Sequence, residues 1–409
     1  MKALIIDPAV HSMGGHHYNA VQRLQDELRK LGVEAPCLGS AYADRRVIQE
    51  LACTPTFTQS VYGRSYATGE FAESVEEASR QLTQAMRRLS GAPDLIILPC
   101  CDQVLAAAVA RYLKSIRFGP RPHLLLWLLY GPHHLRATDH REIAGLKDDS
   151  TKAFSALKAA AGDAARLKVF CETAALARFY RGLTGLDIGV MPGPGLVAHA
   201  RAKRAAASRP IVSCIGFANH PKGYRLLPDA VRHVLQHHDA TQFMIHGVVG
   251  GSDAETDRPI FDRLVDMGPR VTVRQDVLTP QEYLAWLSQA DLLLMPYDRE
   301  VYRSRGSGVF SDARSIGIPV VATQGCAFAQ PAFEGGWGVA IEDYSGLGLG
   351  SAILSGLARL DDLGARASLA ANQAHDDLGR VLQTAIDGVA NRKPAGLAGI
   401  VRRWAAGSS

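Results

Sequence analysis

The chain has 409 residues, of which 47% are hydrophobic and 21% charged, and its formal net charge is +5. This length predicts two domains, each large enough for its own hydrophobic core. The composition excludes a disordered chain, and no apolar run approaches the ~20 residues of a membrane-spanning helix. The mild positive charge suits a phosphate-bearing ligand or an anionic membrane surface, although many proteins without such partners carry as much.

The first residues and the cysteines indicate a cytoplasmic protein. Leu4-Ile5-Ile6 is followed at once by Asp7, so the segment is predicted to be a buried strand and not a signal peptide. The seven cysteines include the adjacent pair Cys100-Cys101, and no two have Cys-x-x-Cys spacing. An odd number without this spacing predicts reduced thiols, not a disulfide framework.

Strand and helix patterns alternate through the first half of the chain. The predicted strands are 4–6, 95–98, 124–129, 167–171 and 188–191, and the predicted helices are 18–31, 71–89, 103–114 and 173–181. Such units build a parallel, doubly wound sheet whose ligands bind at the carboxyl ends of its strands. Gly14 and Gly15, between the first strand and its helix, form an anion-binding arrangement. They lack the Gly-x-Gly-x-x-Gly spacing, which weakens a nicotinamide or flavin interpretation.

A polar, basic, Ala-rich segment at 199–209 separates the halves, and the pattern then restarts. The predicted strands of the second half are 210–216, 242–245, 271–273, 291–295, 319–322 and 339–341. Its predicted helices are 225–235, 280–290 and one from 308 to about 316, with further helix inside 343–363 and 369–404. We therefore predict an N-terminal domain over 1–199 and a C-terminal domain over 200–379. A final helix at about 380–409 is expected to pack back on the first domain.

The loop Arg305-Gly306-Ser307-Gly308 is the strongest candidate site. Ser307 is a good cap for the helix that follows, and Gly317 is a usual stop residue. A glycine-rich loop that leads into a helix exposes free backbone amides to an anion such as phosphate. Asp312, later on the same helix, has the chemistry to accept a hydrogen bond from a sugar hydroxyl. The alternative is an ordinary loop-helix-strand unit of an α/β sheet.

The whole segment 302–323 resembles the donor-binding segment of retaining GT-B glycosyltransferases of the GT4-like group. That pattern has an acidic residue, seven others, a second acidic residue and then a Gly-x-Pro-Val-Val-Ala-Thr tail. Asp312 holds the second acidic position and the tail is intact over 317–323, whereas Ser304 stands at the first. Lys222 matches a second family segment, in which Phe217 replaces an arginine. Arg303 or Arg305 is the hypothesised source of the missing charge.

The resemblance implies a GT-B fold, with two Rossmann-like doubly wound domains facing across a cleft and a C-terminal helical tail. It implies transfer of a sugar from a nucleotide diphosphate-sugar to an acceptor hydroxyl, with retention, in the synthesis of polysaccharide, lipopolysaccharide or another glycoconjugate. The family's step is a front-face attack in which the departing phosphate acts as base. The implied donor-binding residues are Gly14, Gly15, Gly216, Lys222, Arg305, Gly306, Ser307, Gly308, Val309 and Asp312, and the implied catalytic residues are His134, His16 and Lys222.

The resemblance also implies which partners to expect. Asp312 matches the acid that binds the nucleotide ribose, and Ser304 replaces the one near the donor sugar. The expected partners are a nucleotide-sugar donor and a glycan or lipid-linked acceptor, with no nucleic acid, no metal and no cofactor. Peripheral association with the inner face of the membrane is left open, since many relatives dock there.

Several alternatives stay open on the sequence alone. A lone loop histidine is often structural, and His133 competes with His134 for the same role. Lys222 can be a solvated loop lysine, and Asp312 a charge on the surface of its helix. A basic run (Arg111, Lys114, Arg117 and Arg121) is more simply a solvated surface than a membrane contact. The rival functions are a non-catalytic nucleotide-sugar-binding protein of GT-B fold and a GT-B nucleotide-sugar epimerase.

Overall fold

A computed structural model of the chain describes residues 1–13, 16–62, 70–131, 140–191, 193–194, 209–249 and 254–391. Within these residues, the first half forms a seven-stranded parallel sheet in the order β3-β2-β1-β4-β5-β6-β7. The second half forms a six-stranded parallel sheet in the order β12-β10-β8-β13-β14-β15 and a small parallel pair, β11-β9. Two doubly wound sheets were predicted, and both are confirmed.

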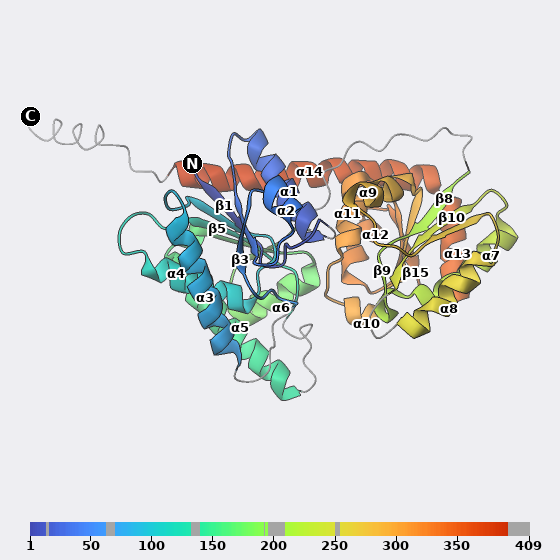
Figure 1. Ribbon diagram of the computed structural model, residues 1–409. Helices are drawn as coiled ribbons and strands as arrows, with labels where there is room; N and C mark the ends of the chain where they lie inside the picture. The colour runs from blue at the N-terminus through green and yellow to red at the C-terminus, as the bar shows by residue number, and fades with distance from the viewer. Residues whose placement is uncertain are drawn as a thin grey trace, which may run out of the picture.

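The elements of the first half alternate regularly between strand and helix (Figure 1). They are β1 (Ala3–Ile6), α1 (His16–Lys30), β2 (Cys37–Ser40), α2 (Arg45–Glu50), β3 (Cys53–Phe57), α3 (Glu70–Arg88), β4 (Leu95–Leu98), α4 (Gln103–Ser115), β5 (His123–Leu128), α5 (His140–Ala161), β6 (Leu167–Cys171), α6 (Ala174–Thr184) and β7 (Ile188–Val190).

The second half repeats this alternation and ends in two helices. Its elements are β8 (Ile211–Cys214), β9 (Phe217–Ala218), α7 (Leu227–His237), β10 (Gln242–His246), β11 (Val248–Val249), α8 (Ala254–Val265), β12 (Val271–Arg274), α9 (Pro280–Gln289), β13 (Leu292–Met295), α10 (Arg299–Tyr302), α11 (Gly308–Ile316), β14 (Val320–Thr323), α12 (Gln330–Glu334), β15 (Gly338–Ile341), α13 (Gly346–Leu357) and α14 (Leu360–Ala390).

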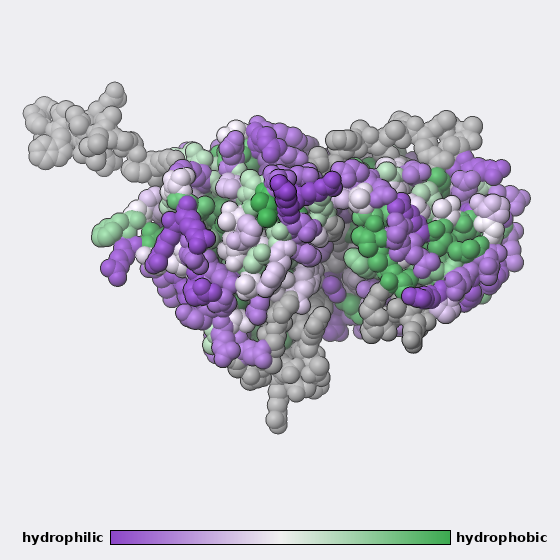
Figure 2. Space-filling model, viewed as in Figure 1, coloured by the Kyte–Doolittle hydropathy of each residue, from purple (hydrophilic) through white to green (hydrophobic). Residues whose placement is uncertain are grey.

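Both sheets are covered on their two faces, which explains why their strands read as continuous apolar runs. In β1, Leu4 and Ile6 join one hydrophobic cluster while Ala3 and Ile5 join the cluster on the opposite face. The strands of the second sheet alternate between two clusters in the same way. Hydrophilic residues cover the outer helices of both halves (Figure 2). The carboxyl ends of the strands are therefore the natural place for polar chemistry.

Several elements were not predicted, namely the strands β2, β3, β9 and β11 and the helices α2, α5, α8, α10 and α12. The sequence of β2, Cys-Leu-Gly-Ser, has no apolar periodicity, and Gly39 is needed there because a Cβ would overlap the Cys53 sulfur. The strand β3 contains Pro55, which is tolerated because β3 is the edge strand of its sheet. Helix α7 begins two residues later than predicted because a 3-10 turn, Tyr224–Leu226, precedes it.

Helix α14 runs alongside both halves (Figure 1). Its first turns place Leu363 and Ala367 in the clusters of the second sheet. Farther along, Leu378, Leu382 and Val389 are buried in a cluster of the first sheet. The 31 residues of this helix span about 46 Å at 1.5 Å per residue, enough to connect the two cores. The part of the predicted C-terminal helix beyond residue 391 lies outside the described residues.

We expect Leu382→Ala to lower the free energy of unfolding by about 2–5 kcal/mol, because it removes a fully buried side chain from the first core. Leu369→Ala on the same helix is the matched control, since Leu369 is 70% exposed. That variant should change stability by less than about 0.5 kcal/mol. Urea unfolding followed by circular dichroism measures both, and equal effects would contradict the packing of α14.

Candidate functional site

The loop before α11 forms as predicted. Ser307 precedes the helix, and its hydroxyl oxygen accepts a hydrogen bond from the Phe310 N–H at 3.4 Å. Gly317 ends the helix in the left-handed conformation, with a φ of 80°. The unpaired N–H groups of the first turn and the helix dipole make this end of α11 electropositive. The predicted cap and stop are thus confirmed, and anion binding by this loop stays a prediction.

Two glycines of this loop lie against side chains from the first half of the molecule. A Cβ at Gly308 would stand 3.0 Å from the Cβ of His16, at the start of α1. A Cβ at Gly306 would overlap the carboxyl group of Glu172, which directly follows β6. A larger residue at Gly306 would displace the Glu172 side chain, and one at Gly308 would require His16 to shift slightly. The loop therefore lies in the cleft between the halves.

Arg305 also bridges the two halves. Its guanidinium carbon lies 5.0 Å from the ring centroid of Tyr130, which follows β5, and 5.4 Å from that of Tyr302 on α10. These are cation–π distances, and they hold the guanidinium inside the cleft. Arg303, the other arginine considered from the sequence, is exposed. Of the two arginines, Arg305 is the one placed to supply the missing charge.

Lys222 reaches the same cleft from the turn His220–Lys222. A Cβ at Gly216 would stand 2.8 Å from the Lys222 ammonium nitrogen, and that nitrogen lies 5.7 Å from the ring centroid of Tyr297. Gly223 has a φ of 69°, and a Cβ there would overlap the Pro296 carbonyl oxygen. Glycines thus leave room for the lysine and fix the turn that carries it. The alternative of a solvated loop lysine does not fit this position.

Lys222 and Arg305, with the His16 ring beside them, form a cationic cluster in which burial and nearby positive charge disfavour the charged forms of Lys222 and His16. Burial, followed by Arg305, lowers the pKa of Lys222 to about 8, with the Cys214 thiol acting in the opposite direction. Burial also holds the pKa of His16 well below its usual value, with smaller effects from His17, Arg305 and Lys222. Within the described ranges neither Lys222 nor Arg305 pairs with a carboxylate. The cluster would therefore gain from a bound anion.

A chain of hydrogen bonds holds His16 from the first half. His17 Nδ1 lies 2.8 Å from the fully buried Asp7 carboxylate, and His17 Nε2 lies 2.9 Å from the Tyr62 hydroxyl. That hydroxyl lies 3.2 Å from His16 Nε2 and 2.6 Å from the Tyr130 hydroxyl. Sequence reasoning selected only His16 from this group. Asp7 and Tyr130 each lie at the carboxyl end of a buried strand. This position could have marked both as candidate site residues, because ligands of such sheets bind there.

Asp312 is 4% exposed, so the alternative of a charge on the helix surface is wrong. Its carboxylate accepts a hydrogen bond from the Tyr283 hydroxyl at 2.9 Å. Val309, one turn earlier, approaches Gly216, where a Cβ would lie 3.9 Å from a Val309 methyl carbon. These contacts bring Asp312, Val309 and Gly216 to the same side of the cleft. Ribose binding by Asp312 stays a prediction.

Three residues of the predicted site lie outside the described residues. They are Gly14, Gly15 and His134, and His133 is also outside them. The described residues on either side of these gaps include His16 and Tyr130, which both belong to the site above.

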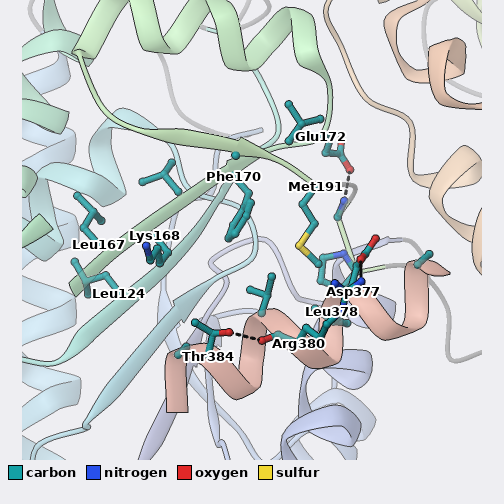
Figure 3. A pocket seen from close by; sticks show the side chains of 18 of the residues that line it. Leu124, Leu167, Lys168, Phe170, Glu172, Met191, Asp377, Leu378, Arg380 and Thr384 are labelled. Atoms are coloured by element: carbon teal, nitrogen blue, oxygen red, sulfur yellow. Dashed lines mark hydrogen bonds and ion pairs between the residues drawn. The ribbon is translucent and has the colours of Figure 1, made fainter. Parts of the chain in front are cut away.

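A cavity of about 1240 Å³ opens behind the loop, between β6, β7, α11 and α14 (Figure 3). Phe170, Met191 and Leu378 form apolar parts of its wall, and Asp377 and Arg380 lie on the α14 side. Glu172 stands at one end of it, whereas His16, Lys222 and Arg305 are not among its lining residues. The charges and close contacts, not this cavity, therefore locate the site.

No group of three or more His, Cys, Asp or Glu side chains among the described residues is arranged to hold a metal ion. No helix in that part of the chain combines the length and hydrophobicity needed to span a bilayer. The basic run at 111–121 lies mainly on the exposed surface, where Arg111 pairs with Glu76.

Residues 209–357, which contain Lys222, the loop and α11, match the family described as Glycosyl transferases group 1. The matched region holds Gly216, Lys222, Arg305 and Asp312 of the site, and His16 and Glu172 approach it from the first half. No curated protein matches the chain in sequence.

Solved structures match the chain over nearly its whole length. A sucrose-phosphate synthase from Thermosynechococcus elongatus is 15% identical, with 100% of both chains covered and a TM-score of 0.60. A glycosyltransferase from Rickettsia africae is 12% identical, with 95% of this chain and 98% of that chain covered and a TM-score of 0.63. Anabaena HepE, solved in complex with UDP, is 14% identical, with 95% and 100% covered and a TM-score of 0.55. This likeness confirms the predicted GT-B fold.

We expect Gly223→Ala to destabilise the protein more than Gly268→Ala, although both glycines have a left-handed backbone. At Gly268 a Cβ meets nothing within 4 Å, so the substitution should cost only the backbone strain of about 1–2 kcal/mol. At Gly223 the Cβ would also overlap the Pro296 carbonyl and displace the turn that carries Lys222. Thermal denaturation compares the two variants, and equal losses would contradict this close contact.

Proposed function

We propose that the chain is a retaining glycosyltransferase of the GT4-like group. It moves a sugar from a nucleotide diphosphate-sugar to an acceptor hydroxyl. The observation that carries this proposal is the cationic cluster of Lys222 and Arg305, with His16 beside it, near the N-terminus of α11. Such a half-buried cluster, without a paired carboxylate among the described residues, suits the diphosphate of a donor.

The same groups fit the chemistry of the transfer. The bond between the anomeric carbon and the diphosphate oxygen breaks, and the acceptor oxygen forms a bond to that carbon on the same face. The acceptor proton passes to the departing phosphate, so no protein nucleophile is required. Negative charge develops on the leaving group, where Lys222, Arg305 and the amides of α11 stabilise it. Contact between the two halves at Gly306 and Gly308 excludes water, which limits hydrolysis of the donor.

The wider role follows from the proposed reaction. We expect the acceptor to be a glycan or a lipid-linked sugar, in the synthesis of polysaccharide, lipopolysaccharide or another glycoconjugate. The proposal needs no metal and no cofactor besides the donor substrate. It places the protein in the cytoplasm, with peripheral attachment to the inner face of the membrane for a lipid-linked acceptor. In this proposal His134 has the predicted catalytic role. Gly14 and Gly15 are proposed to bind the donor phosphates.

We expect Arg305→Ala to weaken binding of a nucleoside diphosphate by about tenfold or more, because a charge-assisted contact is lost. Arg303→Ala is the matched control, since this arginine is two residues away and exposed. UDP, GDP, ADP, CMP and TDP are first tested by thermal shift, and the nucleotide that binds is then titrated calorimetrically. The cluster is not the diphosphate site if Arg305→Ala binds that nucleotide as well as Arg303→Ala does.

Turnover separates the enzyme from its two rivals. With the donor identified, the proposed transferase releases nucleoside diphosphate and forms a glycoside with the original anomeric configuration. A non-catalytic binding protein would bind the donor and release no nucleotide. An epimerase would return a nucleotide-sugar with one inverted sugar carbon, which nuclear magnetic resonance detects.

Donor binding should take up a proton at pH 8. The pKa of Lys222 in the free protein is about 8, and a bound diphosphate raises it by favouring the ammonium form. Affinity is then greatest below pH 8 and falls by up to about tenfold per pH unit above it. The ionisable groups facing Lys222 are Cys214, Arg305, His16 and His246. Calorimetry in HEPES and in Tris at pH 8 measures the uptake, and Lys222→Met should abolish it.

A further inference from the structure

The carboxyl group of Glu172 is presented to the second half of the molecule. Its Oε1 accepts a hydrogen bond from the Gly193 N–H at 3.3 Å. Its Oε2 is the atom that a Cβ at Gly306 would overlap. One oxygen is therefore held within the first half and the other lies against the loop before α11. Among the described residues no hydrogen bond to Oε2 is found.

The backbone of Glu172 is fixed against the same loop. Thr173, the next residue, donates its hydroxyl hydrogen to the Ser304 carbonyl oxygen at 2.6 Å. The Thr173 hydroxyl oxygen also accepts from the Leu176 N–H at 3.1 Å and so caps α6. Ser304 is the position where the resembled pattern has an acidic residue. The first half thus brings a carboxyl group to the part of the loop where the second half lacks one.

The two ends of the loop meet different groups of the first half, and Arg305 lies next to the Gly306 end. His16 and the first amides of α11 lie at Gly308, whereas Glu172 lies at Gly306. Two residues span at most about 7 Å, so the two ends are about one sugar ring apart. A carboxylate repels a diphosphate but accepts hydrogen bonds from hydroxyl groups. The Gly308 end therefore suits the phosphates and the Gly306 end suits an uncharged polyol.

We propose that Glu172 binds a hydroxyl group of the sugar being transferred and so contributes to the choice of donor. This inference rests on the proposed function, because it requires a nucleotide-sugar in the cleft. The carboxylate accepts a hydrogen bond from the sugar at the Gly306 end, while the cationic cluster holds the diphosphate. Arg305, His17 and Asp312 are the charged or ionisable groups whose fields reach Glu172. Burial is the main reason that the Glu172 pKa rises to about 7.

The test compares two affinities in each of three proteins. UDP, GDP, ADP and TDP and their glucose conjugates are titrated calorimetrically into the wild type, Glu172→Gln and Asp377→Asn. Asp377 is the matched control, because it lines the same cavity from α14 and pairs with Arg380. We expect Glu172→Gln to bind the nucleoside diphosphate within twofold of the wild type. It should bind the nucleotide-sugar about tenfold more weakly, because a hydrogen bond to a charged group is replaced by a neutral one.

A donor analogue with one hydroxyl replaced by hydrogen tests the contact directly. The wild type should lose affinity for the analogue that lacks the bound hydroxyl, and Glu172→Gln should not distinguish it from the parent sugar. Equal loss of nucleotide and nucleotide-sugar affinity in Glu172→Gln would make Glu172 a structural contact and overturn the inference. If Glu172→Gln does not fold, Glu172→Asp should show the same selective loss for the sugar. No nucleotide binding by the wild type would overturn the proposed function instead.

Discussion

The positively charged side chains of Lys222 and Arg305, half-buried in the cleft with His16 beside them, are the constraint on which the rest of the site depends. A cation that loses hydration without gaining a counterion is unfavourable, and the lowered pKa values of His16 and Lys222 express this cost. Arg305 stays charged, because its guanidinium cannot lose its proton near neutral pH and the rings of Tyr130 and Tyr302 surround it. The fold nevertheless holds Lys222 and Arg305 close enough for Arg305 to lower the pKa of Lys222.

The residues of the cluster come from both halves of the molecule. His16 belongs to the first sheet, and Lys222 and Arg305 to the second, so the cluster exists only when the halves are together. The small residues of the 304–308 loop permit this contact, and α14 is buried in both cores and limits how far the halves can separate. In the proposed transfer, substrate binding and exclusion of water would thus depend on the same surfaces.

Local sequence patterns predicted those parts of the arrangement that depend only on residues adjacent in the sequence. The cap at Ser307, the stop at Gly317 and the apolar strands are all readable from a few consecutive positions. Strand β2, with its glycine and serine, exists because the neighbouring strands of its sheet pair with it. Glu172 and Tyr62 reach the cleft through contacts across 134 and 68 residues of sequence, to Gly306 and Tyr130, and no local spacing encodes such contacts.

The departure at Ser304 illustrates why a sequence pattern and a site are different things. A binding site depends on where a carboxyl group lies, not on its position in the sequence. In a cleft, either wall can provide that group. Here the wall with the cations has a buried serine at that position, and the opposite wall has Glu172. The Glu172 carboxyl group meets the Gly306 end of the loop, close to Arg305, while the first amides of α11 lie at the Gly308 end. In the proposed transfer, the donor would place its phosphates at these amides and its sugar toward Glu172 and the first half of the molecule.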